Sequence, residues 1–153
     1  MLAWPLFLLV LQSPQSASAP LNDKEQLQYE VLSSPVERLD FLESVVERYL
    51  REFRDHSRRK NFDGFTPLLD SYSKLLDFVQ ANFLKVPEAQ RRKSKTLRRL
   101  EIRLRKARED LEDFKRGSPA DQQAAFDECV EQTESLRTTI LQSLFGKGLL
   151  KDR

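Results

Sequence analysis

The chain has very few of the residues on which most small catalytic and metal sites depend. Its 153 residues include one histidine, one cysteine and four glycines. A single cysteine excludes a disulfide within the chain, and one cysteine with one histidine leaves no ligand set for a structural zinc site. Neither Gly64 nor Gly117 belongs to a glycine-rich loop, so no backbone cradle for a phosphate is predicted. We therefore expect no catalytic residues, no cofactor, no metal site and no small-molecule substrate.

The only histidine and the only cysteine both fit structural positions. His56 lies at the charged end of a predicted helix, where a cation suits the helix dipole, and an acid-base role is the alternative. Cys129 lies on a predicted apolar stripe next to Val130, which favours a buried thiol that packs as a small hydrophobic side chain. A disulfide to another chain is the alternative for Cys129.

The sequence also lacks an apolar run long enough to span a bilayer. Residues 2–11 are apolar apart from Pro5, whereas a transmembrane helix needs about 20 apolar residues. A polar stretch ending in Ala17-Ser18-Ala19 follows, which is the layout of a secretory signal peptide. We predict a signal peptide over residues 1–19, cleaved near Ser18 or Ala19, and export to the periplasm or the extracellular space. The missing basic start and the position of Pro20 leave membrane association by an uncleaved segment as the alternative.

What the sequence does contain is a mixture typical of amphipathic helices, with 39% hydrophobic and 33% charged residues. Ser34-Pro35, Thr66-Pro67 and Ser118-Pro119 each place a hydroxyl before a proline, a pattern that marks helix starts. Asn22 offers a cap for a short leading helix within residues 20–33. We predict main helices over about 35–60, 67–84, 87–116 and 119–145, followed by a C-terminal tail over residues 146–153.

Apolar residues recur every three or four positions in each predicted helix. These stripes are Leu39, Leu42, Val46, Tyr49, Phe53; Leu69, Tyr72, Leu76, Val79, Phe83; Leu97, Leu100, Leu104, Ala107, Leu111, Phe114; and Phe126, Cys129, Thr133, Leu136, Ile140, Leu144. Four such stripes predict an all-α, up-and-down bundle of four main helices over residues 34–145. An extended helical hairpin or a coiled-coil dimer is the alternative.

Two further expectations follow from the positions of the apolar residues. The second main helix carries Leu68, Leu75 and Phe78 off its stripe, so it should be covered on more sides than the others. No internal repeat is expected, because a copy of the first helix pair shifted onto the second does not keep its apolar positions in register.

One stretch, residues 91–108, is unusually basic. From Lys85 to Arg108 the chain has eleven Lys or Arg against two Glu, whereas Glu109 to Glu134 has nine acids against two bases. The third helix is thus basic at its start and acidic toward its end, opposite to the preference of the helix dipole. The candidate interaction surface comprises Arg91, Arg92, Lys93, Lys95, Arg98, Arg99, Glu101, Arg103, Arg105, Lys106, Arg108 and Asp110.

Three partners could satisfy this charge. The first main helix has the opposite order, acidic early and basic late, so the chain could neutralise itself. In a square bundle the first and third helices should run parallel on a diagonal. Two copies of the third helix could instead pair antiparallel about a point between Leu104 and Ala107, with Glu101 facing Arg108 and Arg103 facing Asp110. An anionic polymer or a surface of lipid headgroups is the third partner, whereas nucleic acid is disfavoured because the stretch has no aromatic residue for base stacking.

The sequence therefore predicts an exported, non-enzymatic helical bundle that acts by binding another protein or another copy of itself. Polyanion or membrane-surface binding through residues 91–108 is the alternative, and an enzyme is the second alternative. The identity of the partner does not follow from the residues.

Overall fold

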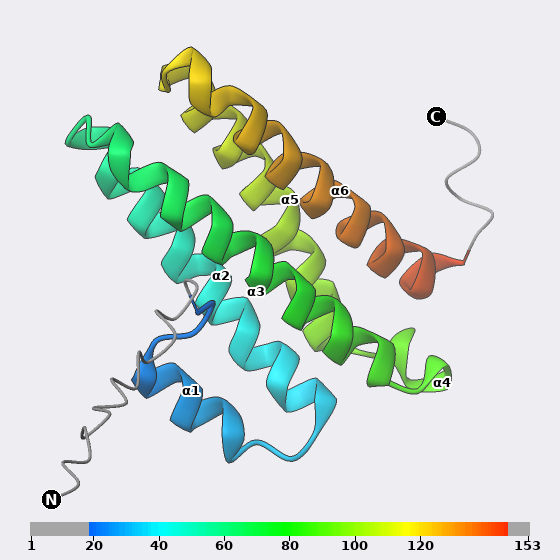
Figure 1. Ribbon diagram of the computed structural model, residues 1–153. Helices are drawn as coiled ribbons and strands as arrows, with labels where there is room; N and C mark the ends of the chain where they lie inside the picture. The colour runs from blue at the N-terminus through cyan, green and yellow to red at the C-terminus, as the bar shows by residue number, and fades with distance from the viewer. Residues whose placement is uncertain (1–18, 147–153) are drawn as a thin grey trace, which may run out of the picture.

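The computed structural model describes residues 19–146, and these form an all-α fold (Figure 1). The predicted signal peptide and most of the predicted tail lie outside the described residues. Two 3-10 turns, Phe62–Gly64 and Ala120–Gln122, precede α3 and α6. The six α-helices are α1 Asp23–Glu30, α2 Pro35–Arg58, α3 Phe65–Lys85, α4 Glu88–Arg91, α5 Lys95–Gly117 and α6 Gln123–Phe145.

The four long helices form a bundle in which α2 packs against α3 and α5, and α6 packs against α3 and α5 (Figure 1). Ion pairs between Asp40 and Arg99 and between Arg54 and Asp110 show that α2 and α5 run parallel. The expectation that these two helices lie on a diagonal is therefore wrong. The connection through α4 crosses the end of the bundle diagonally, which brings α5 beside α2 instead of opposite it.

The predicted apolar stripes form the core. Every stripe residue is buried except Phe114, which is half-buried and packs against the core. The side chains of Leu68 and Leu75 are also buried, and the Phe78 ring contacts the ring of Tyr29 in α1. The prediction that the second main helix is covered on more sides is confirmed, because α3 has ten buried residues whereas α2, α5 and α6 have seven, six and six.

The predicted helix over residues 87–116 is two helices. The short α4 ends at Arg91, and α5 begins only after Ser94, whose hydroxyl accepts a hydrogen bond from the amide of Leu97 at 3.2 Å. Ser94 satisfies one of the free amides at the helix start, which makes it the N-cap. This serine lies inside the basic stretch, and the cap separates residues 91–93 from the helix that carries the remaining bases.

The buried positions of α2 and α5 correspond, although the apolar stripes of the two helix pairs do not keep one register, as expected. A shift of 58 residues carries the 3-10 turn at Phe62–Gly64 onto the one at Ala120–Gln122. The same shift carries the buried stripe of α2 onto that of α5, pairing Leu39 with Leu97 and Phe53 with Leu111. The same shift places Leu69, Leu76 and Val79 of α3 on Asp127, Glu134 and Arg137, so the correspondence does not extend to the apolar stripe of the second helices.

The short helix α1 lies against the first hairpin through mostly polar contacts. Asn22 and Glu25 form a reciprocal capping box, as the Asn22 cap predicts. Glu25 also accepts hydrogen bonds from Arg48 of α2, and the hydroxyl of Tyr49 donates to the carbonyl oxygen of Pro20 at 2.7 Å. These contacts fix the start of α1 on the outer side of α2.

None of the helices described between residues 19 and 146 is long and apolar enough to cross a membrane.

Candidate functional site

The basic stretch separates into a part that is paired within the chain and a part that is not. Arg99 forms an ion pair with Asp40, and Arg103 lies 2.8 Å from Glu43 and 3.2 Å from Glu47. These three acids come from the first half of α2. The acidic start of α2 therefore lies level with the basic start of α5, as the parallel arrangement predicts.

The remaining bases from Arg105 to Arg108 also have partners within the chain. Glu101 is only 8% exposed, and its carboxylate lies 3.0 Å from Nε of Arg137 and 3.9 Å from Arg105. The other pairs join Arg108 to Glu112 at 3.6 Å and to Glu134 at 3.5 Å, and Asp110 to Lys106 at 3.3 Å and to Arg54 at 3.6 Å. An exposed pair contributes only about 0.2–1 kcal/mol, so this network sets the order of the helices more than their stability.

The seam expected for an antiparallel dimer lies inside the bundle. Leu104 and Ala107 are fully buried against the other helices. Glu101 and Arg103, which were expected to face a second copy, already pair with Arg137 and with two glutamates of α2. A dimer of this fold would have to use another surface.

Four bases at the start of the stretch stay exposed and form no ion pair with any residue from 19 to 146, and Lys85 at the end of α3 shares this property. Arg91 differs, because its guanidinium donates to the carbonyl oxygens of Val86 and Leu84 and lies over the Phe83 ring. We call the exposed set the basic end: Lys85, Arg92, Lys93, Lys95 and Arg98.

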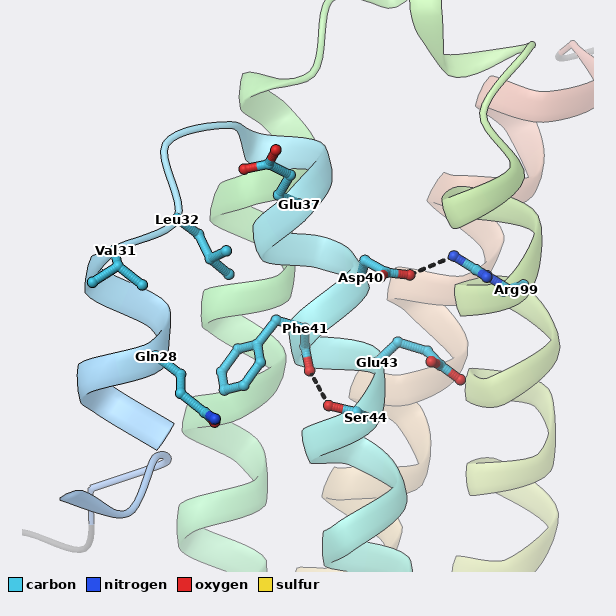
Figure 2. A pocket seen from close by; sticks show the side chains of 9 residues that line it. All are labelled: Gln28, Val31, Leu32, Glu37, Asp40, Phe41, Glu43, Ser44 and Arg99. Atoms are coloured by element: carbon cyan, nitrogen blue, oxygen red, sulfur yellow. Dashed lines mark hydrogen bonds and ion pairs between the residues drawn. The ribbon is translucent and has the colours of Figure 1, made fainter. Parts of the chain in front are cut away.

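A groove with a volume of about 820 Å³ includes Arg99 in its lining. Figure 2 shows it between α1 and the first half of α2. We call it the α1–α2 groove, and its lining residues are Gln28, Val31, Leu32, Glu37, Asp40, Phe41, Glu43, Ser44 and Arg99.

The groove has an apolar side and an acidic side (Figure 2). Val31, which is 81% exposed, and Leu32 directly follow α1, and the Phe41 ring projects from α2 toward Gln28. Asp40 points the other way, toward Arg99 of α5. The hydroxyl of Ser44 donates to the Phe41 carbonyl oxygen at 2.6 Å and is therefore occupied within α2.

The acidic side carries more negative charge than its neighbours neutralise. The Glu37 carboxylate forms no ion pair within residues 19–146, and Asp40 pairs with Arg99 across a surface where both are more than half exposed. Glu43 is better shielded and pairs with Arg103. A second, smaller hollow shares Glu43 and Arg99 with the groove and extends to Ile102, which is 54% exposed.

Sequence reasoning did not select this groove. Its acids were noticed only as counter-charges for the basic helix. The available signal was Phe41, a large aromatic residue between the stripe positions Leu39 and Leu42 and therefore on a different face of the helix. The position of Val31 and Leu32 had no comparable signal in the sequence. It depends on where α1 lies, which is set by the hydrogen bonds of Arg48 to Glu25 and of Tyr49 to Pro20.

His56 occupies a packed position at the far end of α2. Its Nδ1 lies 3.2 Å from the Asn61 amide nitrogen, and its ring meets the edge of Phe65. The ring also lies so close to Gly64 that a side chain there would collide with it, since an added Cβ would be 2.5 Å from Cε1. These contacts give the histidine a structural role, and no carboxylate or nucleophile is bonded to it in the described structure.

Cys129 is a free, buried thiol, as its place on the stripe predicts. Its Sγ lies 3.6 Å from the carbonyl oxygen of Leu69. Burial, with smaller contributions from Glu128 and Asp70, raises the pKa of the Cys129 thiol to about 12. The thiolate required for disulfide exchange is therefore disfavoured in the folded protein.

Within the described part of the chain, no group of three or more His, Cys, Asp or Glu side chains is arranged to hold a metal ion. The comparisons with known proteins add no relative: no protein-family model matches the chain, and neither a curated protein nor a solved structure shows significant similarity to it.

Proposed function

We propose that the protein is a non-catalytic binding module whose α1–α2 groove holds an amphipathic helical segment of another protein. The observation that carries this proposal is the combination of a partly exposed apolar wall and the unpaired carboxylate of Glu37 in one groove. A segment that fits would present apolar side chains to Val31, Leu32 and Phe41, and basic side chains to Glu37 and Asp40.

The apolar wall supports a protein partner because Val31 is largely exposed and Leu32 and Phe41 keep part of their surface in contact with water in the free chain. Val31 is 81% exposed, and Phe41 is only partly buried. Burying apolar surface is favourable by about 25 cal/mol per Å², so a partner that covers these side chains gains binding free energy. Amphipathic helices commonly bind in grooves of this kind through apolar residues spaced three and four apart.

The acidic side supplies orientation and selectivity. Glu37 forms no ion pair within residues 19–146, and the exposed pair of Asp40 with Arg99 is easily exchanged for a pair with a partner. Charge complementarity of this kind mainly accelerates association and excludes acidic partners. We therefore expect binding that weakens as salt increases.

The test uses a synthetic amphipathic peptide of leucine and lysine in helical spacing, titrated into the ¹⁵N-labelled chain lacking residues 1–18. We expect the largest amide shift changes at Val31, Leu32, Phe41 and Ser44. Glu37→Lys should weaken binding by about fivefold or more, because it reverses the one unpaired charge in the groove.

Glu128→Lys is the matched control, since it makes the same charge change on an exposed position of α6. It should leave the affinity within about twofold. Equal weakening by both variants, or shift changes spread evenly over all acidic surfaces, would show that the peptide reads only net charge and would contradict the groove as a specific site.

A second copy of the chain is the alternative occupant, because the basic end carries charge opposite to that of the groove. Sedimentation equilibrium at low and moderate salt distinguishes the two. A monomer at both salt concentrations supports a different protein as partner, whereas a dimer that Glu37→Lys disrupts supports self-association.

We further propose that the chain acts after export, with the segment before Ala19 removed. Trp4 is the only tryptophan, so protein purified from its natural source should show tyrosine emission alone. Tryptophan emission from that protein would mean that the leader is retained.

A further inference from the structure

At the basic end, five cations that form no ion pair with residues 19–146 lie at the same end of the bundle as exposed apolar side chains. Lys85 closes α3, and Arg92, Lys93, Lys95 and Arg98 span the α4–α5 connection and the first turn of α5. All five are exposed, and none forms an ion pair within the described range. Between Lys85 and Arg98 the chain contains Glu88 as its only acid, so positive charge dominates this segment.

Two large apolar side chains project from the same end of the bundle. Leu84, near the end of α3, is 61% exposed, and Phe145, the last residue of α6, is 57% exposed. Figure 1 shows the ends of α3 and α6 beside α4, and α4 contacts α6. The Arg92 guanidinium lies close to Gly146, about 4.0 Å from the position that a Cβ atom would take there. A cation is therefore near the residue that follows Phe145.

A hollow of about 420 Å³ opens at this end between the starts of α2 and α5. Its lining includes Val36 and Ala89 as apolar contacts, with Lys93 and Lys95 at its edge. The end of the bundle thus combines a shallow apolar hollow, two projecting apolar side chains and five cations.

We propose that the basic end docks the protein on an anionic phospholipid surface. The cations would contact phosphate groups, and Leu84 and Phe145 would enter the boundary between headgroups and acyl chains. Each basic residue near an anionic surface strengthens binding by a factor of about five. Contact through the loop and helix ends is peripheral, since no described helix spans a bilayer.

The apolar residues favour a bilayer over a soluble polyanion. A sulfated or phosphorylated polymer would pair with the cations but would leave Leu84 and Phe145 in water. The opposite end of the bundle gives the useful contrast: Arg51, Arg58, Arg59 and Lys60 are exposed there without ion pairs, but Asp55 and Asp63 lie among them. None of the large apolar side chains exposed in the described chain belongs to that end.

The test is co-sedimentation of the chain lacking residues 1–18 with vesicles of phosphatidylcholine alone or with about one third phosphatidylglycerol. We expect binding only to the anionic vesicles, with loss as salt increases. Replacing Arg92, Lys93, Lys95 and Arg98 together by Gln should weaken vesicle binding by about a hundredfold. Each of the four basic residues contributes a factor of up to about five to the affinity.

The matched control replaces Arg51, Arg58, Arg59 and Lys60 by Gln, which changes the net charge equally at the other end. It should change vesicle binding by less than about threefold. Leu84→Ser with Phe145→Ser should weaken vesicle binding while leaving retention on a heparin column unchanged. Circular dichroism and thermal unfolding establish that each variant is folded.

Three results would overturn the proposal. One is equal loss of binding in the two quadruple variants, and another is binding that the paired serine substitutions do not affect. The third is tight retention on heparin without binding to anionic vesicles, which would assign the basic end to a soluble polyanion. None of these results bears on the α1–α2 groove, because its residues are unchanged in every variant.

Discussion

Glu101 forms the most shielded ion pair between α5 and α6 among the described residues. Its carboxylate lies 3.0 Å from Nε of Arg137, and both side chains are largely shielded from water. A hydrogen bond to a charged group contributes more than a neutral one, and breaking it leaves part of the desolvation cost uncompensated. The pair therefore differs from the exposed pairs elsewhere on the surface.

We predict that Glu101→Gln lowers the free energy of unfolding by about 1.5 kcal/mol. Arg137 retains Glu134 at 2.8 Å, which limits the loss. Urea unfolding measures the change. Asp113→Asn is the control, because its pair with Arg116 is highly exposed and should contribute less than about 0.5 kcal/mol. Equal effects of the two substitutions would contradict the assignment.

The thiol of Cys129 gives the protein a predictable alkaline instability. Its pKa is raised by burial from 9.0 to about 12, so the unfolded chain loses this proton at lower pH than the folded chain does. A raised pKa of this kind means that stability is full below pH 9 and falls as pH rises toward the folded value. The buried Tyr72, whose pKa burial also raises, contributes mainly above pH 10.

Between pH 8 and pH 9.5 the free energy of unfolding should therefore fall by about 0.8 kcal/mol because of Cys129. Cys129→Ala should remove most of this decrease, even if it lowers stability at every pH by leaving a small cavity. Urea unfolding over this pH range provides the measurement. A decrease of the same size in the alanine variant would mean that another group is responsible.

At the scale of helices, the apolar periodicity predicted the buried face of each long helix, because burial follows local spacing. The start of α2 was also predictable, since Ser34 accepts hydrogen bonds from the amides of Val36 and Glu37.

The break at Ser94 was missed because the basic residues around it are all compatible with a helix. Pro67 and Pro119 marked chain turns correctly but not the first residues of α3 and α6.

The helix α1 should be the first to detach, because its own residues bury little apolar surface. Burial acts to lower the pKa of Arg48, but its hydrogen bonds to Glu25 and Glu52 outweigh this and raise it above the usual value. The cation is thus held firmly between the two carboxylates, and its guanidinium also lies over the Tyr49 ring.

Arg48→Met should release α1 while leaving the bundle folded. We expect amide hydrogen exchange in residues 23–30 to accelerate by about tenfold or more, with little change in the stripe residues of α3 and α6. Hydrogen exchange followed by mass spectrometry measures both. Arg51→Met is the control, because Arg51 is exposed and makes no ion pair in the described structure. Uniform acceleration through the bundle would contradict the view that α1 is held independently.

At the scale of the whole molecule, the acid-base order of the first and third helices suggested self-neutralisation as one of three possibilities, and the ion pairs of Arg99 and Arg103 with α2 show that part of the charge is paired within the chain. The diagonal placement predicted for them was wrong, because helix order in sequence does not determine which way a connection crosses the end of a bundle. The site was harder to predict than the core. The α1–α2 groove joins residues from α1, α2 and α5, and only the folded arrangement brings Val31, Phe41 and Arg99 to one surface.

The central claim is that the protein binds its partner through the α1–α2 groove. The most direct measurement places a photo-cross-linking amino acid at Phe41, and separately at Glu128, in the cells that make the protein. We predict a discrete adduct from position 41 that Glu37→Lys abolishes, and no such adduct from position 128. The same adducts from both positions, or an adduct from position 41 that survives Glu37→Lys unchanged, would contradict the claim.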